Sequence, residues 1–166
     1  MSSEAIQVPA GLTTEGLLGK RYMARFIDSV ILSILLVLSV AVVGTGRAER
    51  PSILLLGILL VLWLTYGTLL ESSARQATLG KMAMGLRVYD AQGARLTFGQ
   101  AALRNLVKDG PFLLLGAVPG GNLLAFALLI AHIVVIQRSD VNQAIHDRLA
   151  HTWVSAPEGT TQLHIA

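Results

Sequence analysis

The stretch Phe26–Val43, FIDSVILSILLVLSVAVV, decides the fold of this chain because it is apolar over a length that matches a membrane. At about 1.5 Å per residue, a helix of this length spans roughly 27 Å, close to the hydrocarbon core of a bilayer. Asp28 is its one charged residue. An ionised carboxylate is costly in hydrocarbon, so Asp28 needs a partner, a water-filled cavity or a proton.

Two arginines upstream are the candidate partners of Asp28. Arg25 precedes it by three residues and Arg21 by seven, and both spacings bring side chains to roughly the same helix face. We expect an ion pair that sets the depth of the helix at the cytoplasmic interface, since long arginine side chains can reach Asp28 there. A gated ion or proton site is the alternative interpretation.

The composition of the whole chain agrees with a membrane location. Hydrophobic residues make up 53% and charged residues 14%, whereas a soluble domain has about 25% charged residues. The mean hydropathy is +0.62, and a second apolar run follows at Ile53–Leu70. The basic residues lie beside the apolar runs, which favours anionic lipid over nucleic acid as a partner. The absence of cysteine excludes disulfides, thiolate metal sites and cysteine nucleophiles.

The sequence predicts an all-α integral membrane protein with three to four transmembrane helices, an interfacial amphipathic helix and a small cytoplasmic hairpin loop. The predicted parts are a flexible N-terminus (1–14), a membrane domain (15–154) with spans at about 24–44, 53–71 and 112–137 and a break at 119–122, and a disordered tail (155–166). Basic residues predict that the N-terminus and the 71–110 loop are cytoplasmic. The side of the C-terminus stays open, because three crossings put it outside and a fourth returns it.

The 71–110 loop contains two predicted elements. The segment LRVYDAQGARLTF, residues 86–98, has the alternation and the central turn residues of a hairpin. Thr97 and Gln100 have the spacing of a capping box and begin an amphipathic helix. Arg104 lies on its polar face, so we expect this helix at the membrane interface. Gly110–Pro111 should end it.

Four motifs resemble those of the RDD family, which are small bacterial membrane proteins named for one arginine and two aspartates. In chain order they are Arg21-x-x-Ala24-x-x-Ile27-Asp28, Thr78-Leu-Gly80-Lys81-x-x-x-Gly85-Leu-Arg87-Val88, Leu96-Thr-Phe98-Gly99 with Leu103-Arg104-Asn105, and Ile145-His146-Asp147-Arg148-Leu149-Ala150-His151-Thr152. His151 departs from the pattern, since the family usually has glycine there.

The resemblance implies that Arg21, Asp28 and Asp147 are the name-giving residues. It also implies a multi-pass protein of the bacterial inner membrane. The family is largely uncharacterised, with transport of an unknown ligand suspected and cation–proton exchange proposed for some members.

Other charged residues have both a functional and a structural interpretation. His132, in the last apolar run, is a candidate for proton relay because its pKa lies near neutrality; the alternative is a neutral histidine hydrogen-bonded between helices. Glu71 and Arg75 have i, i+4 spacing, which predicts a surface salt bridge.

The C-terminal motif brings metal-ligand residue types together without completing a metal site. His146, Asp147 and His151 lack a further ligand at metal-site spacing, so we expect Asp147 to cap a helix or to dock. Gly80-Lys81 lacks the rest of a phosphate loop. We therefore expect neither a cofactor nor an enzyme.

Two functions remain open at this point. The first is transport of an unknown ligand or ion, with Arg21, Asp28 and His132 lining the path, in a homo-oligomer or with other membrane proteins. The second is a membrane scaffold or assembly factor that binds protein partners through the 71–110 loop and the tail.

Overall fold

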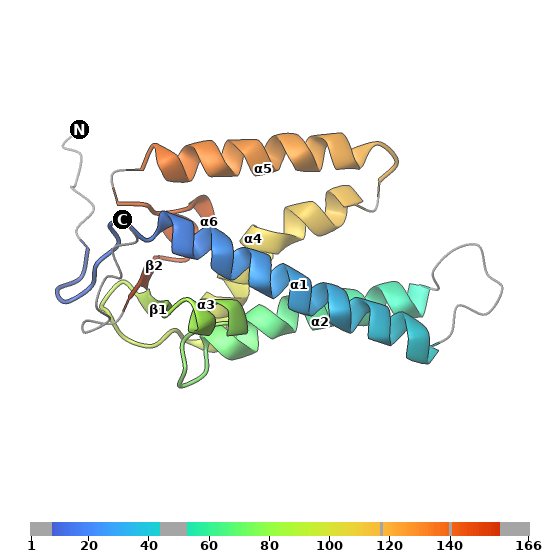
Figure 1. Ribbon diagram of the computed structural model, residues 1–166, viewed down its shortest axis with the longest axis horizontal. Helices are drawn as coiled ribbons and strands as arrows, with labels where there is room; N and C mark the ends of the chain where they lie inside the picture. The colour runs from blue at the N-terminus through green and yellow to red at the C-terminus, as the bar shows by residue number, and fades with distance from the viewer. Residues whose placement is uncertain (1–7, 44–52, 117, 140, 157–166) are drawn as a thin grey trace, which may run out of the picture.

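The computed structural model describes residues 8–43, 53–116, 118–139 and 141–156, and Figure 1 shows the course of the chain. Most of these residues are helical. The elements are α1 (Leu18–Val43), α2 (Ile53–Glu71), α3 (Leu79–Ala83), β1 (Arg87–Asp90), α4 (Phe98–Gly116), α5 (Gly121–Gln137), α6 (Ile145–Leu149) and β2 (Thr152–Ser155). The predicted loop between the first two apolar runs, residues 44–52, lies outside the described residues.

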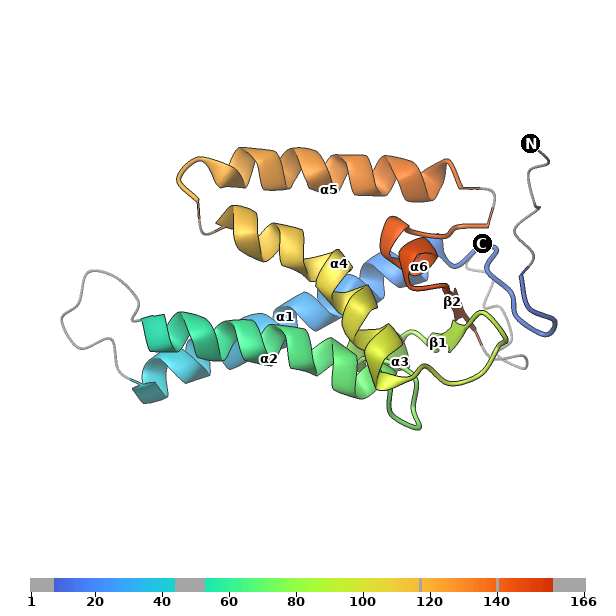
Figure 2. The same ribbon diagram turned by 180° about the vertical axis from the view of Figure 1, so that it is seen from behind.

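The long helices form two layers. Helices α1 and α2 lie side by side, and α4 packs against α2 and α5 (Figures 1 and 2). Among the described residues, the segment Leu18–Ser39 of α1 is long and apolar enough to cross a membrane, and Leu123–Gln137 is a shorter apolar helix. Apolar side chains point outward on three of these helices, with Phe26 64%, Leu114 74% and Leu123 76% exposed. Such surfaces are suited to lipid rather than to water.

Helix α4 differs from the interfacial helix that its sequence predicts. Its N-terminus has the predicted capping box, in which Gln100 N donates to Thr97 Oγ1 (3.2 Å) and Thr97 N donates to Gln100 Oε1 (2.9 Å). The predicted break at Gly110–Pro111 is wrong, since the helix continues through Pro111 to Gly116. Arg104 is buried in the protein, so the polar face of α4 points inward at this residue, and its predicted place at the membrane interface stays a prediction. A polar face prefers the interior when the outer surface is apolar.

The chain reverses between α4 and α5, at the break predicted for residues 119–122. Gly120 has φ of +76°, which a residue without Cβ adopts readily. A Cβ on Gly121 would lie 1.9 Å from Leu115 O, so only glycine allows the end of α4 to approach this closely. The two helices are therefore separate elements rather than one kinked span.

The predicted hairpin is replaced by a sheet between distant segments. Strand β1 pairs antiparallel with β2, in the register Val88 with Val154, and not with residues 94–98. The turn itself is present, since Asp90 Oδ1 accepts from the amides of Gln92 (2.9 Å) and Ala94 (2.7 Å). All four residues of β2 are buried, so their backbone groups need hydrogen-bond partners that β1 supplies.

Both ends of the described chain join this sheet. Thr13 forms a bridge with Ala156, and its amide donates to Ser155 Oγ (3.0 Å). Asn142 Nδ2 donates to Thr14 O (3.1 Å). The segments predicted to be flexible or disordered are 1–14 and 155–166, to which Thr13, Thr14, Ser155 and Ala156 belong. Residues 1–7 and 157–166 lie outside the described residues. The core beside the sheet consists of Leu17, Ala24, Leu86, Val88, Leu96, Ala101, Val154 and Ala156.

Candidate functional site

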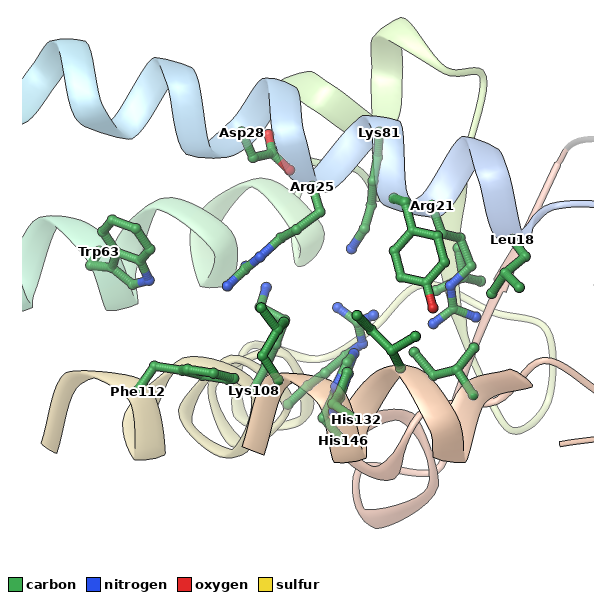
Figure 3. Close-up of a pocket in the computed structure, with 16 residues that line it drawn as sticks. Leu18, Arg21, Arg25, Asp28, Trp63, Lys81, Lys108, Phe112, His132 and His146 are labelled. Atoms are coloured by element: carbon green, nitrogen blue, oxygen red, sulfur yellow. The ribbon is translucent and has the colours of Figure 1, made fainter. Parts of the chain in front are cut away.

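A cavity of about 380 Å³ lies between α1 and α5, and residues of α2, α3, α4, α6 and β2 complete its walls (Figure 3). One part of the wall is apolar and another is basic. The lining residues are Leu18, Arg21, Tyr22, Arg25, Asp28, Trp63, Lys81, Arg104, Lys108, Phe112, Leu129, His132, Ile133, Ile136, His146 and Val154.

Arg104 is the centre of a buried ion-pair network at one side of the cavity. Its Nη1 donates to both carboxylate oxygens of Glu71 at 2.7 Å. Its Nε (3.0 Å) and Nη2 (2.7 Å) donate to Asp147 Oδ1. All three side chains are almost completely buried. The planar guanidinium holds two carboxylates at once, which a lysine could not do in this geometry.

Glu71 has two further partners. Lys81 forms an ion pair with it, and Asn105 Nδ2 donates to its Oε2 at 3.0 Å. The predicted salt bridge between Glu71 and Arg75 is therefore wrong. Burial and the neighbouring Arg104 lower the pKa of Lys81 to about 7, although Glu71 opposes this. The charge of Lys81 therefore changes with pH near neutrality.

Asp147 is held from both sides. Besides Arg104, Arg21 forms an ion pair with it and also donates from Nη1 to Asn142 O (2.6 Å). Asp147 Oδ2 accepts from Ala144 N (3.2 Å), which caps α6. Burial raises the pKa of Asp147, but the guanidinium groups of Arg21 and Arg104 outweigh it and hold that pKa well below its usual range. Asp147 therefore has both of the roles, capping and docking, that its sequence context predicts.

Asp28 does not form the predicted ion pair. It accepts hydrogen bonds from Tyr66 Oη (2.8 Å), Thr78 Oγ1 (2.6 Å) and Gly80 N (2.8 Å). The two arginines predicted as its partners pair with other carboxylates. Arg21 binds Asp147, and Arg25 Nη2 donates to Asp109 Oδ1 at 2.5 Å.

The close approach of α3 explains the neutral partners of Asp28. A Cβ on Gly80 would lie 2.1 Å from Ala24 O, so α3 packs directly on the backbone of α1. This contact brings the Thr78 hydroxyl and the Gly80 amide to the carboxylate of Asp28.

His132 and His146 stack at the α5 side of the cavity. Their ring centroids are 5.0 Å apart and their planes differ by 6°. Nε2 of His146 lies 3.3 Å from Asp147 Oδ1, while its buried Nδ1 has no hydrogen-bond partner among the described residues. Burial holds the pKa of His146 well below its ordinary value, so its ring is neutral at neutral pH.

The motifs that meet at this cavity are those of one family. The RDD family model matches residues 16–151. The chain belongs to the RDD family. This confirms the resemblance seen in the sequence. No curated protein and no solved structure matches the chain.

The residues that name the RDD family occupy distinct positions in this member. Arg21 and Asp147 form one ion pair, whereas Asp28 has neutral partners on α2 and α3. Of the five site residues predicted from the sequence, four line the cavity, namely Arg21, Arg25, Asp28 and His132. Asp147 lies behind them as the partner of Arg21 and Arg104.

The sequence reasoning missed most of the charges that surround the cavity. Glu71, Lys81, Arg104 and Lys108 belong to it or to its network, and none was predicted as a site residue. A signal was available, since Arg104 and Lys108 are four residues apart on one face of α4. The same spacing is equally typical of a helix face exposed to water. Only the packing of α4 against α2 shows that this face lines a buried cavity instead.

Proposed function

We propose that this RDD protein is a multi-pass protein of the bacterial inner membrane that contributes to transport by binding its solute in the cavity between α1 and α5. The observation that carries the proposal is a charged cavity bordered by a helix apolar enough to cross a membrane. Charged side chains within a membrane are expensive and mark substrate or ion pathways. A purely structural core of this size would be filled with apolar side chains.

The proposed topology has four spanning helices, α1, α2, α4 and α5, with both termini cytoplasmic. Residues near the start and the end of the described chain support it, because Thr13 pairs with Ala156 and β1 pairs with β2. These contacts require the N-terminal segment, the 71–110 loop and the C-terminal segment to share one side. The basic residues of the N-terminal flank and of residues 72–97, which connect α2 to α4, favour the cytoplasm for that side.

Single cysteines test this topology without background labelling, because the chain has no cysteine of its own. The exposed positions Glu15, Arg95 and His151 lie at the proposed cytoplasmic end, and the exposed Val118 lies in the reversal between α4 and α5. A membrane-impermeant maleimide should label Val118→Cys in intact spheroplasts. It should label the other three only after permeabilisation. Labelling of Arg95→Cys in intact spheroplasts, before permeabilisation, would overturn the proposed topology.

Flux through proteoliposomes tests the transport role. A panel of inorganic ions and organic anions is measured with and without a pH gradient. The test variant is Asp28→Asn, which removes the charge, keeps the oxygen that accepts from Tyr66 and Gly80, and replaces the oxygen that accepts from Thr78 by an amide nitrogen. The control is Arg75→Gln, an exposed residue outside the cavity. We expect the wild type and the control to move a solute that Asp28→Asn does not.

The scaffold role makes the opposite prediction. If the wild type moves no solute of the panel, and exchange of surface residues in the 71–110 loop removes a co-purifying protein, the transport proposal fails. We also propose that several copies of the chain assemble in the membrane and that the protein acts without catalysis.

A further inference from the structure

We propose that the cavity between α1 and α5 binds an oxyanion, a phosphate or carboxylate group, carried on a molecule with an apolar part. This inference rests on the proposed function, for which it names the class of solute. It comes from the arrangement of charge, of free hydrogen-bond donors and of apolar surface around the cavity.

The charges that reach the cavity surface are predominantly positive. The five basic side chains that line it are Arg21, Arg25, Lys81, Arg104 and Lys108, against the single carboxylate of Asp28. The carboxylates that pair with the basic groups, Glu71, Asp109 and Asp147, are at most 4% exposed and lie behind them. Asp28 already accepts three hydrogen bonds. A ligand in the cavity therefore meets cations before it meets anions, which disfavours a metal cation.

Several donors at the surface of the cavity have capacity left for a ligand. Arg25 is 40% exposed, and its guanidinium makes one hydrogen bond among the described residues, to Asp109, although a guanidinium carries five N–H donors. Figure 3 shows the nitrogen ends of Arg25 and Lys108 pointing toward one another from opposite walls. Asp109 is within ion-pair distance of both, 2.5 Å from Arg25 Nη2 and 3.4 Å from Lys108 Nζ, so an oxyanion in the cavity would accept from the N–H donors of the two residues that Asp109 leaves unused.

Tyr22 Oη, one of two buried polar atoms without a partner among the described residues, reinforces this interpretation; the other, Nδ1 of the neutral His146 ring, is an acceptor because Nε2 faces Asp147, and it suits a water or another donor. Tyr22 Oη and His146 Nδ1 are inaccessible to solvent and lack hydrogen-bond partners within the part of the chain that the structure describes. Both residues line the cavity, and His146 is 5% exposed. Buried polar atoms are rarely left without partners, so each unsatisfied atom in a cavity calls for a ligand or ordered water. A hydroxyl donates readily to an oxyanion.

The rest of the lining fits an apolar group. Trp63 and Phe112 lie at one end of the cavity beside Arg25 and Lys108 (Figure 3), and Leu129, Ile133 and Ile136 contribute from α5. A free inorganic anion would leave this surface unused. An amphiphilic anion would use both parts. Such a molecule has two possible sources, the headgroup of an anionic phospholipid in the bilayer and a soluble organic anion.

Binding measurements on the purified full chain in a neutral detergent test the proposal. The probes are octyl phosphate, octylammonium of the same chain length, and inorganic phosphate, each followed by calorimetry and by the shift in thermal unfolding. We expect octyl phosphate to bind and octylammonium not to bind. Competition by inorganic phosphate would identify a soluble anion as the source. Enrichment of phosphatidylglycerol over phosphatidylcholine in lipid co-purified from mixed nanodiscs would identify a phospholipid.

Variants connect the binding to the cavity. Arg25→Gln should weaken octyl phosphate binding at least tenfold, whereas Arg75→Gln, an exposed arginine outside the cavity, should not change it. Tyr22→Phe removes a hydroxyl that has no partner among the described residues, so it should keep the fold and still weaken binding severalfold. Equal binding of octylammonium and octyl phosphate, or unchanged binding in both cavity variants, would overturn the proposal.

The two proposals can fail separately. Anion binding that Arg25→Gln weakens, without flux of any solute, would overturn transport and leave the anion site in place. Flux of a cation that Arg25→Gln does not alter, without anion binding, would overturn the anion site and leave transport in place.

Discussion

Arg21 and Asp147 form a buried ion pair although 126 positions separate them, and the pair joins the first helix to α6 at the end of the chain. Asp147 also accepts from Arg104 on α4. Three elements therefore depend on one carboxylate that is itself inaccessible to solvent. Arg21 and Asp147 thus connect α1 to α6, and Asp147 also connects α6 to α4.

Asp147→Asn should destabilise the protein strongly. The change leaves two buried guanidinium groups facing an amide, and removal of one partner from a buried ion pair costs about 3–5 kcal/mol. The measurement is the free energy of unfolding in detergent. Glu15→Gln, at an exposed position, is the control and should change it by less than about 0.5 kcal/mol. Equal stability of the two variants would refute a structural role for the ion pair.

Arg104→Lys should also be poorly tolerated, although the charge is kept. Arg104 donates to Glu71 and Asp147 through different nitrogens, and an ammonium group cannot reach both in this geometry. One buried carboxylate then loses its charged partner, for which we expect a loss of about 2–4 kcal/mol in the free energy of unfolding. Arg75→Lys, which exchanges the same residue types at an exposed position, should behave as wild type. If Arg104→Lys has the same free energy of unfolding as the wild type, an ion pair with one of the two carboxylates is enough for the stability of the protein.

The elements that the sequence predicted correctly depend on local patterns. Apolar runs predicted α1 and α2, and the spacing of Thr97 and Gln100 predicted the capping box of α4. Each of these is decided within a few turns of chain. The helical face shared by Arg21, Arg25 and Asp28 was also predicted correctly, since all three line the same cavity.

The partners of the charged residues could not be predicted in this way. Glu71 was expected to bind Arg75 four residues later, and instead binds Arg104, 33 positions away. Asp28 was expected to bind an arginine, and instead binds neutral donors on α2 and α3. Which charges meet depends on which helices pack together, and hydropathy describes the apolar outer faces of these helices better than their polar inner faces.

Gly80→Ala tests the contact that gives Asp28 its neutral partners. The new Cβ would lie 2.1 Å from Ala24 O and 2.8 Å from Asp28 Oδ1, and backbone atoms cannot move aside cheaply. We expect α3 to shift away from α1, with a loss of about 1–3 kcal/mol in the free energy of unfolding. Gly19→Ala is the matched control, because a Cβ there meets nothing within 4 Å. It should stabilise α1 by about 0.5–1 kcal/mol. Equal effects of the two changes would contradict the close packing of α3 on α1.

The stability of the protein should depend on the protonation of Lys81. Burial and Arg104 lower the pKa of Lys81 to about 7 in the folded protein, from 10.5 in an exposed lysine. Below about pH 7 the lysine is protonated in both the folded and the unfolded chain, so it contributes no pH dependence. Between about pH 7 and 10.5 the unfolded chain binds a proton that the folded chain has released. The free energy of unfolding therefore rises with pH in this window.

Lys81→Met isolates this contribution, because other groups titrate equally in both proteins. Unfolding in detergent is followed from about pH 6 to pH 9.5. Relative to the variant, the wild type should gain at most about 1.4 kcal/mol per pH unit above pH 7 and nothing below it. Lys20→Met, on α1 and outside the cavity lining, should follow the wild type. Parallel curves for wild type and Lys81→Met would mean that Glu71 keeps Lys81 protonated throughout the window, since their ion pair opposes the effect of burial.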